Sequence, residues 1–297
     1  MSDRIVECVP NFSEGRNQDV IDAISNAGRG IPGARVLGIE PDADYNRTVL
    51  TIAGEPDAVS EAAFRVIEAA LEHIDMSSHE GEHPRIGAVD VCPFVPLKNV
   101  TMDDCVDLSK ELAIRVSNEL EIPTFLYGAA ATSPDRCLLS DLRKGQYEAF
   151  KERLENGGPH LPDFGPREWT DVVSKFGAVV IGARNILVAY NVNVDEKDAR
   201  AAKIAGSLVR TSGRLLKQND GRRTRIPGML EMVQGMGLPL EAHGISQVSM
   251  NLRDVSVTPM HIAFEAVKAL VNDHGIQTCG SELVGLVPLS AMLESGR

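Results

Sequence analysis

Chemically versatile side chains are concentrated in one short stretch, from His79 to Asp90, which reads His-Glu-Gly-Glu-His-Pro-Arg-Ile-Gly-Ala-Val-Asp. It holds two histidines, His79 and His83, beside acidic side chains and Arg85. An imidazole exchanges protons near neutral pH and is also a common metal ligand. The stretch therefore suggests either acid–base catalysis by a histidine or a metal site. The simplest alternative is a pair of histidines in a surface loop.

The metal hypothesis depends on the match of residues 79–83 to the H-E-x-x-H pattern of zinc enzymes. Both imidazoles reach one zinc ion only when this pattern lies on a helix. Gly81, in the middle of the pattern, weakens a helix by about 1 kcal/mol relative to alanine. Pro84 disfavours a helical backbone at His83. Both residues argue against zinc, and we expect no metal.

The stretch lies between two regular elements, where functional loops are common. Apolar residues recur at helical spacing before it, from Ala58 to Ile74, and the apolar run from Ala88 to Val95 predicts a strand after it. The same periodicities predict, further upstream, a strand over 4–9, a helix over 18–27, and strands over 34–39 and 47–53. The resulting order, β-α-β-β-α-β, is that of the ferredoxin-like fold.

The second half of the chain repeats this order without a residue-by-residue repeat. Its predicted elements are strands over 186–194, 230–236, 245–252 and 277–284, and helices over 195–209, 258–272 and 288–293. Between the two halves we expect a helix over 103–120, a strand over 124–127 and a helix over 146–154. We therefore predict two similar subdomains, residues 1–180 and residues 181–297.

Composition excludes several classes of function. The net charge of −12 disfavours a nucleic-acid partner. The five cysteines form no C-x-x-C pair, which indicates reduced thiols in a cytoplasmic protein. The N-terminus lacks the apolar segment of a signal peptide, and no apolar run is long enough to span a membrane. We expect neither export nor a membrane span.

Two other stretches have a composition suited to binding. Residues 156–166 are rich in glycine and proline, which is typical of a linker or a binding loop. Phe164 and Trp169 either anchor this segment to the core or form a wall for a flat heterocycle. Residues 210–225 are predicted to form a basic loop, which is either solvated or binds carboxylates or phosphates. The chain lacks the motifs of P-loop, Rossmann and serine hydrolase sites.

Several motifs, in order along the chain, resemble those of glutamate formimidoyltransferase, the transferase part of formimidoyltransferase–cyclodeaminase. They are Ile-Val-Glu-Cys-Val-Pro-Asn-Phe-Ser-Glu-Gly at 5–15, Asn-Arg-Thr-Val at 46–49, Gly-Glu-His-Pro-Arg at 81–85, Asp-Val-Cys-Pro-Phe at 90–94, Asp-Phe-Gly-Pro at 163–166, Gly-Ala-Arg at 182–184 and Leu-Val-Gly-Leu-Val-Pro-Leu at 283–289. The resemblance extends from about residue 4 to 293. We expect a transferase without the helical cyclodeaminase part.

The resemblance implies an α/β (α+β) fold of two ferredoxin-like βαββαβ subdomains, often dimeric, with a ligand tunnel between them. It implies transfer of a formimidoyl group between N-formimidoyl-L-glutamate and N5 of tetrahydrofolate, which is then a co-substrate. It also implies that His83, in the Gly-Glu-His-Pro-Arg motif, is the catalytic acid/base. The folate segment of the family falls on the Asp-Phe-Gly-Pro motif and the residues after it, which gives Phe164, Gly165, Pro166, Arg167, Gly177 and Ala178.

The chemistry agrees with this assignment. An amine attacks the donor carbon only as the neutral base, so a side chain must take its proton and later protonate the departing nitrogen; a histidine suits both steps. Glu82, or Glu40 where the family carries an aspartate, would orient the ring or stabilise the amidinium. Arg85 and Arg184, with the basic segment 210–225, are candidates for the substrate carboxylates. The alternatives are transfer of a formyl group from N-formylglutamate and a folate-binding protein without turnover.

Overall fold

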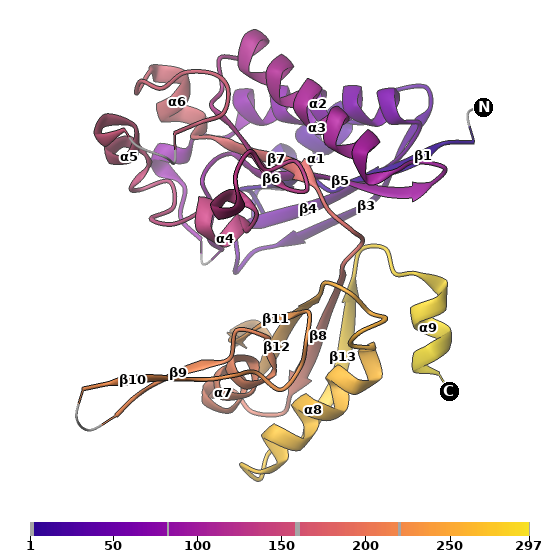
Figure 1. The fold of residues 1–297 in the computed structure, drawn as a ribbon, viewed down its shortest axis with the longest axis vertical. Coiled ribbons are helices and arrows are strands. Elements are labelled where there is room, and N and C mark those ends of the chain that lie inside the picture. The colour runs from indigo at the N-terminus through magenta and orange to yellow at the C-terminus, as the bar shows by residue number, and fades with distance from the viewer. Residues whose placement is uncertain (1–2, 82, 158–160, 219–220, 297) are drawn as a thin grey trace. The chain divides into compact units, whose positions relative to one another are not determined.

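The computed structural model describes residues 3–81, 83–157, 161–218 and 221–296. The chain divides into two compact units, Met1–Asn185 and Ile186–Arg297 (Figure 1). Each unit contains the β-α-β-β-α-β order, so the predicted α+β fold with two subdomains is confirmed. The ligand tunnel between the subdomains stays a prediction.

The first unit is built on one mixed sheet. Its described strands are β1 (Ile5–Cys8), β2 (Asn11–Phe12), β3 (Ala34–Asp42), β4 (Arg47–Gly54), β5 (Val89–Lys98), β6 (Thr124–Gly128) and β7 (Val179–Ala183). Strand β1 lies between β4 and β5, and β3 pairs with the other edge of β4, all antiparallel. Beyond β5, strands β7 and β6 extend the sheet with parallel pairing. The ferredoxin-like core is thus widened on one side.

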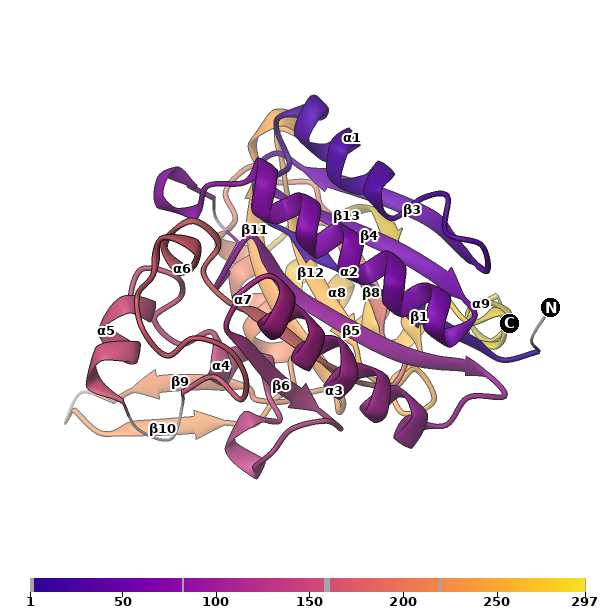
Figure 2. The same cartoon turned by 90° about the horizontal axis from the view of Figure 1, so that it is seen from above.

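Helices α1 (Gln18–Ala27), α2 (Pro56–His73) and α3 (Met102–Glu119) lie side by side over one face of this sheet (Figure 2). Helix α2 buries small and apolar side chains at helical spacing, among them Val59, Ala63, Val66 and Ala70. A capping box at Thr101 begins α3. These faces pack with apolar residues of β1, β4 and β5 into the main core of the unit.

Shorter elements of the first unit surround a second apolar cluster beside β6 and β7. They are α4 (Leu139–Leu142), α5 (Phe150–Asn156), α6 (Asp171–Phe176) and η2 (Pro134–Arg136). The remaining short helix, η1 (Met76–Ser78), contributes Met76 to the main core. The cluster includes Ile86, Phe125 and Phe150, with Trp169 packed against it. Trp169 therefore anchors its segment to the core, which is one of the two alternatives that the sequence left open. Because Ile86 belongs to the cluster, the histidine-containing loop is fixed at that point.

The second unit has a four-stranded antiparallel sheet, in the order β11-β12-β8-β13, within the described residues. Its elements are β8 (Val188–Val194), α7 (Arg200–Val209), β11 (Val233–Leu240), η3 (Glu241–His243), β12 (Ile245–Leu252), α8 (Met260–Asn272), β13 (Thr278–Val284) and α9 (Leu289–Ser295). Helices α7 and α8 pack on one face over a core rich in valine. A Cβ on Gly237 would lie 2.1 Å from the backbone of Ala202, so only glycine allows α7 to approach β11 so closely.

The basic segment 210–225, predicted as a loop, instead contains a hairpin, so that prediction was wrong. Strand β9 (Arg214–Lys217) pairs antiparallel with β10 (Arg223–Ile226). The hairpin extends away from the sheet of its unit (Figure 1). Cations and apolar residues alternate imperfectly along both strands, which hides the period of two that identifies a strand.

Candidate active site

The loop from His79 to Asp90 does not form the helix that a zinc site requires. The short helix η1 ends at Ser78, and His79 has an extended backbone, with φ −78° and ψ 130°. Among the residues that the structure describes, no group of three or more His, Cys, Asp and Glu side chains is arranged to hold a metal ion. The H-E-x-x-H match therefore lacks the geometry behind the zinc hypothesis. Glu82, predicted to be catalytic, lies outside the described residues.

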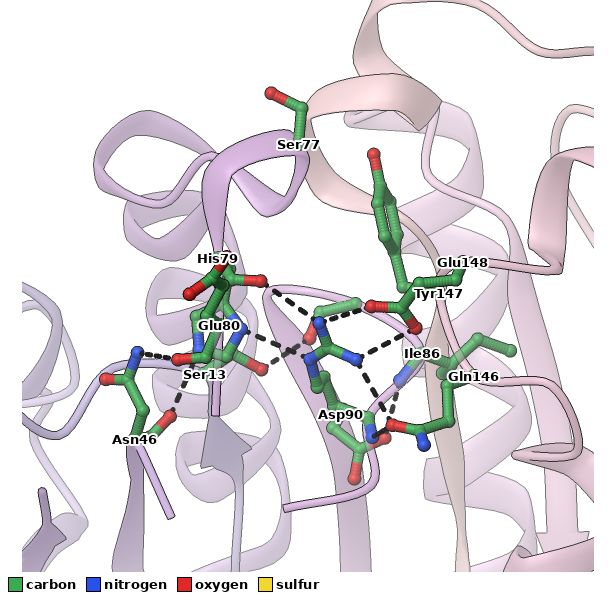
Figure 3. Close-up of polar contacts among 12 residues, drawn as sticks. Ser13, Asn46, Ser77, His79, Glu80, Ile86, Asp90, Gln146, Tyr147 and Glu148 are labelled. Carbon is green, nitrogen blue, oxygen red and sulfur yellow. Dashed lines mark hydrogen bonds and ion pairs between the residues drawn. The ribbon is translucent and has the colours of Figure 1, made fainter. Parts of the chain in front are cut away.

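Asn46 holds the first half of the loop. Its left-handed backbone, with φ 49°, turns its side chain to accept from the Gly15 N–H (3.0 Å) and to donate to the Glu80 carbonyl (2.8 Å). Figure 3 shows Asn46 facing Glu80. A Cβ on Gly81 would lie 2.5 Å from the Tyr45 carbonyl oxygen, so the loop passes too close to this turn for any side chain there. The turn before β4 thus sets the path of the loop.

Arg85 fixes the middle of the loop. Its Nε donates to Nδ1 of His79 (3.2 Å) and its Nη2 to the His79 carbonyl (3.1 Å). The guanidinium forms a bidentate pair with Glu148 (2.6 and 3.0 Å), and Nη1 also donates to Gln146 (3.1 Å). Figure 3 shows Gln146, Glu148 and His79 converging on this point. All five N–H groups of the guanidinium therefore have protein acceptors.

His79 is held in one tautomer by these contacts. Since Nδ1 accepts from Arg85, the proton is on Nε2, which donates to the carbonyl of Asn46 (3.2 Å). Burial is the first cause that lowers the pKa of His79, with a further contribution from the charge of Arg85. Both ring nitrogens are occupied, so His79 serves to shape the loop.

The second half of the loop is fastened by Asp90 and by a short backbone bridge. The buried carboxylate of Asp90 accepts from the Ile86 N–H (3.0 Å) and from Nε of Arg143 (3.1 Å), and it also accepts from the second guanidinium nitrogen. Gly87 forms a bridge with Gly177, whose φ of +80° suits glycine, and the N–H of the next residue, Ala178, donates to the Ile86 carbonyl (3.2 Å). Gly177 and Ala178 are buried and support the loop from behind.

His83 lies beside Arg47. Its Nε2 is 2.9 Å from Nη1 of Arg47, and because a guanidinium only donates, Nε2 accepts and Nδ1 carries the proton. The rings of His83 and Tyr45 pack edge to face, with their centroids 6.0 Å apart. Burial, followed by the charges of Arg47, Arg143 and Arg85, lowers the pKa of His83 to about 2. The imidazole is therefore neutral at physiological pH.

The surroundings of His83 are cationic and incompletely satisfied. Nε of Arg47 is buried and has no hydrogen-bond partner in the described part of the chain. Burial and the charge of Arg143 lower the pKa of Arg47, and burial raises the pKa of Tyr45 to about 12. Sequence reasoning gave no role to Tyr45, Arg47 or Arg143, although Arg47 belongs to a motif that carried the resemblance. An anion would balance these charges and complete the hydrogen bonds.

Two adjoining pockets open on the loop, both in the first unit. The first has a volume of about 440 Å³ and is lined by Arg16, Asp44, His79, Glu80, Gly81, Arg85, Gln146 and Glu148. The second, of about 390 Å³, shares Arg16, His79 and Glu80 with it. The side chain of Arg16 donates from Nε to the Ala43 carbonyl (2.8 Å). Both pockets are large enough for an amino-acid derivative and are lined mainly by polar groups.

The other predicted site residues lie on separate segments of the first unit. Glu40 is on β3, opposite Val49, and its Oε2 is buried without a partner among the described residues. Burial raises the pKa of Glu40. Arg184 follows β7, and its backbone N–H donates to the Phe94 carbonyl (3.1 Å). Burial raises the pKa of Glu7, and the positive charge of Arg184 partly offsets this rise. Neither residue makes a described hydrogen bond to the loop of His83.

The predicted folate segment begins within the Asp-Phe-Gly-Pro motif. Phe164 pairs with Thr124 of β6 through the backbone and packs against the main core. Gly165, with φ +86°, and Arg167 are exposed, whereas Pro166 is partly exposed. The structure therefore separates Phe164–Arg167, near the surface, from the buried pair Gly177 and Ala178.

No helix in the described ranges is long and apolar enough to cross a membrane.

The chain matches two family models, the N-terminal subdomain of the formiminotransferase domain over residues 5–184 and the formiminotransferase domain over residues 189–297.

Curated relatives match nearly the whole chain. Over 98% of its length, the chain is 44% identical to the formimidoyltransferase-cyclodeaminase of Mus musculus. It is 40% identical, also over 98% of its length, to the glutamate formimidoyltransferases of Streptococcus pyogenes and Thermoplasma acidophilum. The chain spans 52% of the mouse protein, about half of it, but 91% and 90% of the other two.

Proposed function

The chain belongs to the formiminotransferase family, and from this we propose that it transfers a formimidoyl group between N-formimidoyl-L-glutamate and N5 of tetrahydrofolate. The observation that carries the proposal is the position of His83, a neutral imidazole beside arginine side chains. A neutral imidazole can accept a proton, and the cations attract acidic substrates.

His83 would act as both base and acid in the transfer. Arg47 would first turn from Nε2 of His83 to the substrate carboxylate, which frees the lone pair of that nitrogen. The lone pair of N5 then attacks the amidinium carbon of the donor, and the N5 proton passes to Nε2 of His83. The imidazolium then protonates the nitrogen of glutamate, the bond between this nitrogen and the transferred carbon breaks, and glutamate leaves as the amine. Holding both substrates in line would supply much of the remaining acceleration.

The donor would also adjust the basicity of His83. A pKa of about 2 makes the ring a weak base in the substrate-free protein, and three guanidinium groups contribute to that value. A substrate carboxylate near Arg47 would offset this charge and raise the pKa of His83 towards neutrality. General acid–base catalysis works best when the pKa of the catalytic group is near the operating pH. Substrate binding would thereby activate the base.

We propose Arg47 and Arg184 as ligands of the substrate carboxylates. Arg47 supports the proposal through its buried, unpartnered Nε. Arg85, predicted from sequence for this role, is only 6% exposed and already holds Glu148. A substrate carboxylate would have to displace Glu148 to reach it, so we propose that Arg85 positions the loop.

We also propose folate binding at Phe164, Gly165, Pro166 and Arg167, where Gly165 and the cation of Arg167 are exposed. Gly177 and Ala178 would contribute by supporting the loop. Glu40, half-buried and without a hydrogen-bond partner at Oε2 in the described residues, would stabilise the amidinium of the donor. The cation would in turn satisfy this carboxylate.

A cytoplasmic location is proposed from the five cysteines, all of which are free thiols. A homodimer is proposed as well. Helix α9 exposes Leu289 and Leu293, apolar side chains that contact with a second subunit would cover.

A donor panel tests the reaction. The purified protein is mixed with tetrahydrofolate and either N-formimidoyl-L-glutamate or N-formyl-L-glutamate, and the folate product is followed by absorbance and mass spectrometry. We expect 5-formimidoyltetrahydrofolate from the first donor. Product from the formyl donor alone would replace the proposal with formyl transfer. Binding of folate without product from either donor would indicate a folate-binding protein.

A further inference from the structure

Arg143 lies near His83 but has no part in the reaction proposed above. It caps the C-terminal end of helix α4, and the residue before it, Leu142, is fully buried in the second apolar cluster of the first unit. Its carbonyl accepts from the Gln146 N–H (2.7 Å). The side chain is only 16% exposed. The backbone that carries this guanidinium is therefore fixed on both sides.

The buried carboxylate of Asp90 holds one edge of the Arg143 guanidinium. Nε of Arg143 donates to Oδ1 of Asp90 (3.1 Å), and Nη2 donates to Oδ2. Such a bidentate pair fixes the plane of the guanidinium as well as its position. Within the described part of the chain, Nη1 of Arg143 has no acceptor. The other edge of the fork is therefore available to a ligand.

Arg47 lies at the same end of the sheet as this pair. Strands β4 and β5, which carry Arg47 and Asp90, both pair antiparallel with the short strand β2 between them, so they run in the same direction. Phe12 of β2 lies opposite Thr48 on one side and Val89 on the other. The backbones of Arg47 and Asp90 are therefore about 10 Å apart, which is twice the spacing of neighbouring strands. Two arginine side chains can converge on one small anion across this distance.

The two guanidinium groups are incompletely satisfied. Nε of Arg47 is buried without an acceptor in the described residues, and Nη1 contacts Nε2 of His83 (2.9 Å). Burial lowers the pKa of both Arg47 and His83, and the charge of Arg143 adds to each effect. Neighbouring like charges repel, and a buried donor without an acceptor is costly. One carboxylate between Arg47 and Arg143 would remove both penalties.

The proposed transfer indicates which carboxylate fits beside His83. This histidine protonates the glutamate nitrogen while the bond from that nitrogen to the transferred carbon breaks. The α-carboxylate of the donor is bonded to the carbon that carries the same nitrogen, whereas the γ-carboxylate lies two methylene groups further along. In tetrahydrofolate, a benzoyl group separates the carboxylates from N5. The α-carboxylate of the donor is therefore the anion that matches a site next to His83.

We propose that Arg143, held by Asp90, is a specificity-determining residue that binds the α-carboxylate of the formimidoyl donor together with Arg47. This inference rests on the proposed function, which supplies the donor, and it adds a second cation for a particular carboxylate. Nη1 of Arg143 donates to one carboxylate oxygen, and the guanidinium of Arg47 donates to the other. Arg47 leaves Nε2 of His83 to make this contact, whereas Arg143 keeps its contact with Asp90. Arg143 takes no part in the proton transfer.

The test compares two donors that differ in the α-carboxylate, N-formimidoyl-L-glutamate and N-formimidoyl-γ-aminobutyrate, which lacks it. Wild type should have a KM about tenfold or more higher for the second donor, as for loss of a hydrogen bond between charged groups. Arg143→Lys keeps a positive charge beside Asp90 but loses the fork. We expect this variant to raise the KM for N-formimidoyl-L-glutamate about tenfold and to leave the KM for the second donor within about twofold of wild type.

The kcat at saturating donor and the KM for tetrahydrofolate should stay within about twofold of wild type in Arg143→Lys. Arg35→Lys, on an exposed position of β3, is the matched control and should change none of these values. If Arg143→Lys shows no cooperative thermal transition, Asp90→Asn, which weakens the hold on Arg143, takes its place. The proposal requires the same selective rise in the KM for N-formimidoyl-L-glutamate from Asp90→Asn.

A purely structural role of Arg143 would raise the KM for both donors alike. That result, or equal KM values for both donors in wild type, would overturn the Arg143 assignment and leave the proposed function intact. If wild type transfers the group from neither donor, the proposed function fails, and the Kd values of the two donors, measured by calorimetry on wild type and variant, decide on Arg143. Binding of neither donor would overturn both.

Discussion

The charge state of His83 predicts a pH dependence of stability that one substitution should remove. In the folded protein its pKa is lowered to about 2, against 6.5 for an unperturbed histidine. The unfolded chain therefore binds a proton as the pH falls below about 6.5, while the folded chain does not. The contribution of His83 to stability is fully present above this pH and is lost progressively as the pH falls towards about 2.

Between pH 7.5 and 5.5, the unfolded chain takes up most of one proton at His83, and the folded chain takes up none. This difference in proton uptake should lower the free energy of unfolding by about 1.4 kcal/mol, the equivalent of one pKa unit. His83→Gln cannot titrate and should lose this component, while those of His79 and of the carboxylates remain. The assay is urea denaturation of wild type and variant at both pH values. Equal pH dependence in the two proteins would refute the lowered pKa.

Arg47→Met is the companion variant. It removes the guanidinium nearest to His83 but leaves the ring buried, and burial is the first cause of the lowered pKa. The comparison with wild type is made below pH 5.5, because the component between pH 7.5 and 5.5 is the same for any folded pKa well below 5.5. There we expect the pH-dependent component to become smaller without vanishing. A component as large as that of wild type would show that Arg47 does not act on the ring.

Three further predictions concern the residues around the loop. Arg85→Ala should lower the stability by about 3 kcal/mol, because it leaves the acceptors at His79 and Glu148 without their donor. Glu148→Gln should lower the stability by only about 1 kcal/mol, because Glu148 is largely exposed. Thermal unfolding of both variants checks this. Gly177→Ala should cost on the order of 3 kcal/mol, because φ is positive and a Cβ would lie 2.3 Å from the Ile86 carbonyl oxygen; Gly275→Ala, at a similar φ in open space, is the control and should cost about 1 kcal/mol in urea denaturation. Glu40→Gln should raise stability at pH 7 but not at pH 4, because burial raises the pKa of Glu40 and so disfavours its charged form in the folded state. The same variant should have a lower kcat. An unchanged kcat would show that Glu40 is not a catalytic residue.

Local patterns in the sequence predicted most regular elements. Helix α1 and strand β12 have the expected ends, because their apolar periodicity stops where the element stops. The helix expected from Gln146 instead begins at Phe150, since Gln146 has a left-handed backbone, φ 57°, and its side chain accepts from Arg85. A tertiary contact overrode the local pattern there.

The candidate site was only partly predictable, because its electrostatics depend on pairs distant in sequence. Arg47 and His83 are 36 residues apart, and Arg85 and Glu148 are 63 residues apart. The sequence shows both histidines and Arg85 but not which acceptors saturate a guanidinium. It also cannot show that His83 lies among cations, since that depends on the pairing of β4 with its neighbours and on the position of Arg143.

The central claim is that His83 transfers the proton during group transfer, and turnover of His83→Ala tests it most directly. Initial rates of 5-formimidoyltetrahydrofolate formation are measured for wild type and variant, and folate binding is measured on the same samples. We predict that kcat falls by about a hundredfold or more while the Kd for folate is unchanged. A kcat within about threefold of wild type would contradict the account, because a lost acid/base catalyst costs far more.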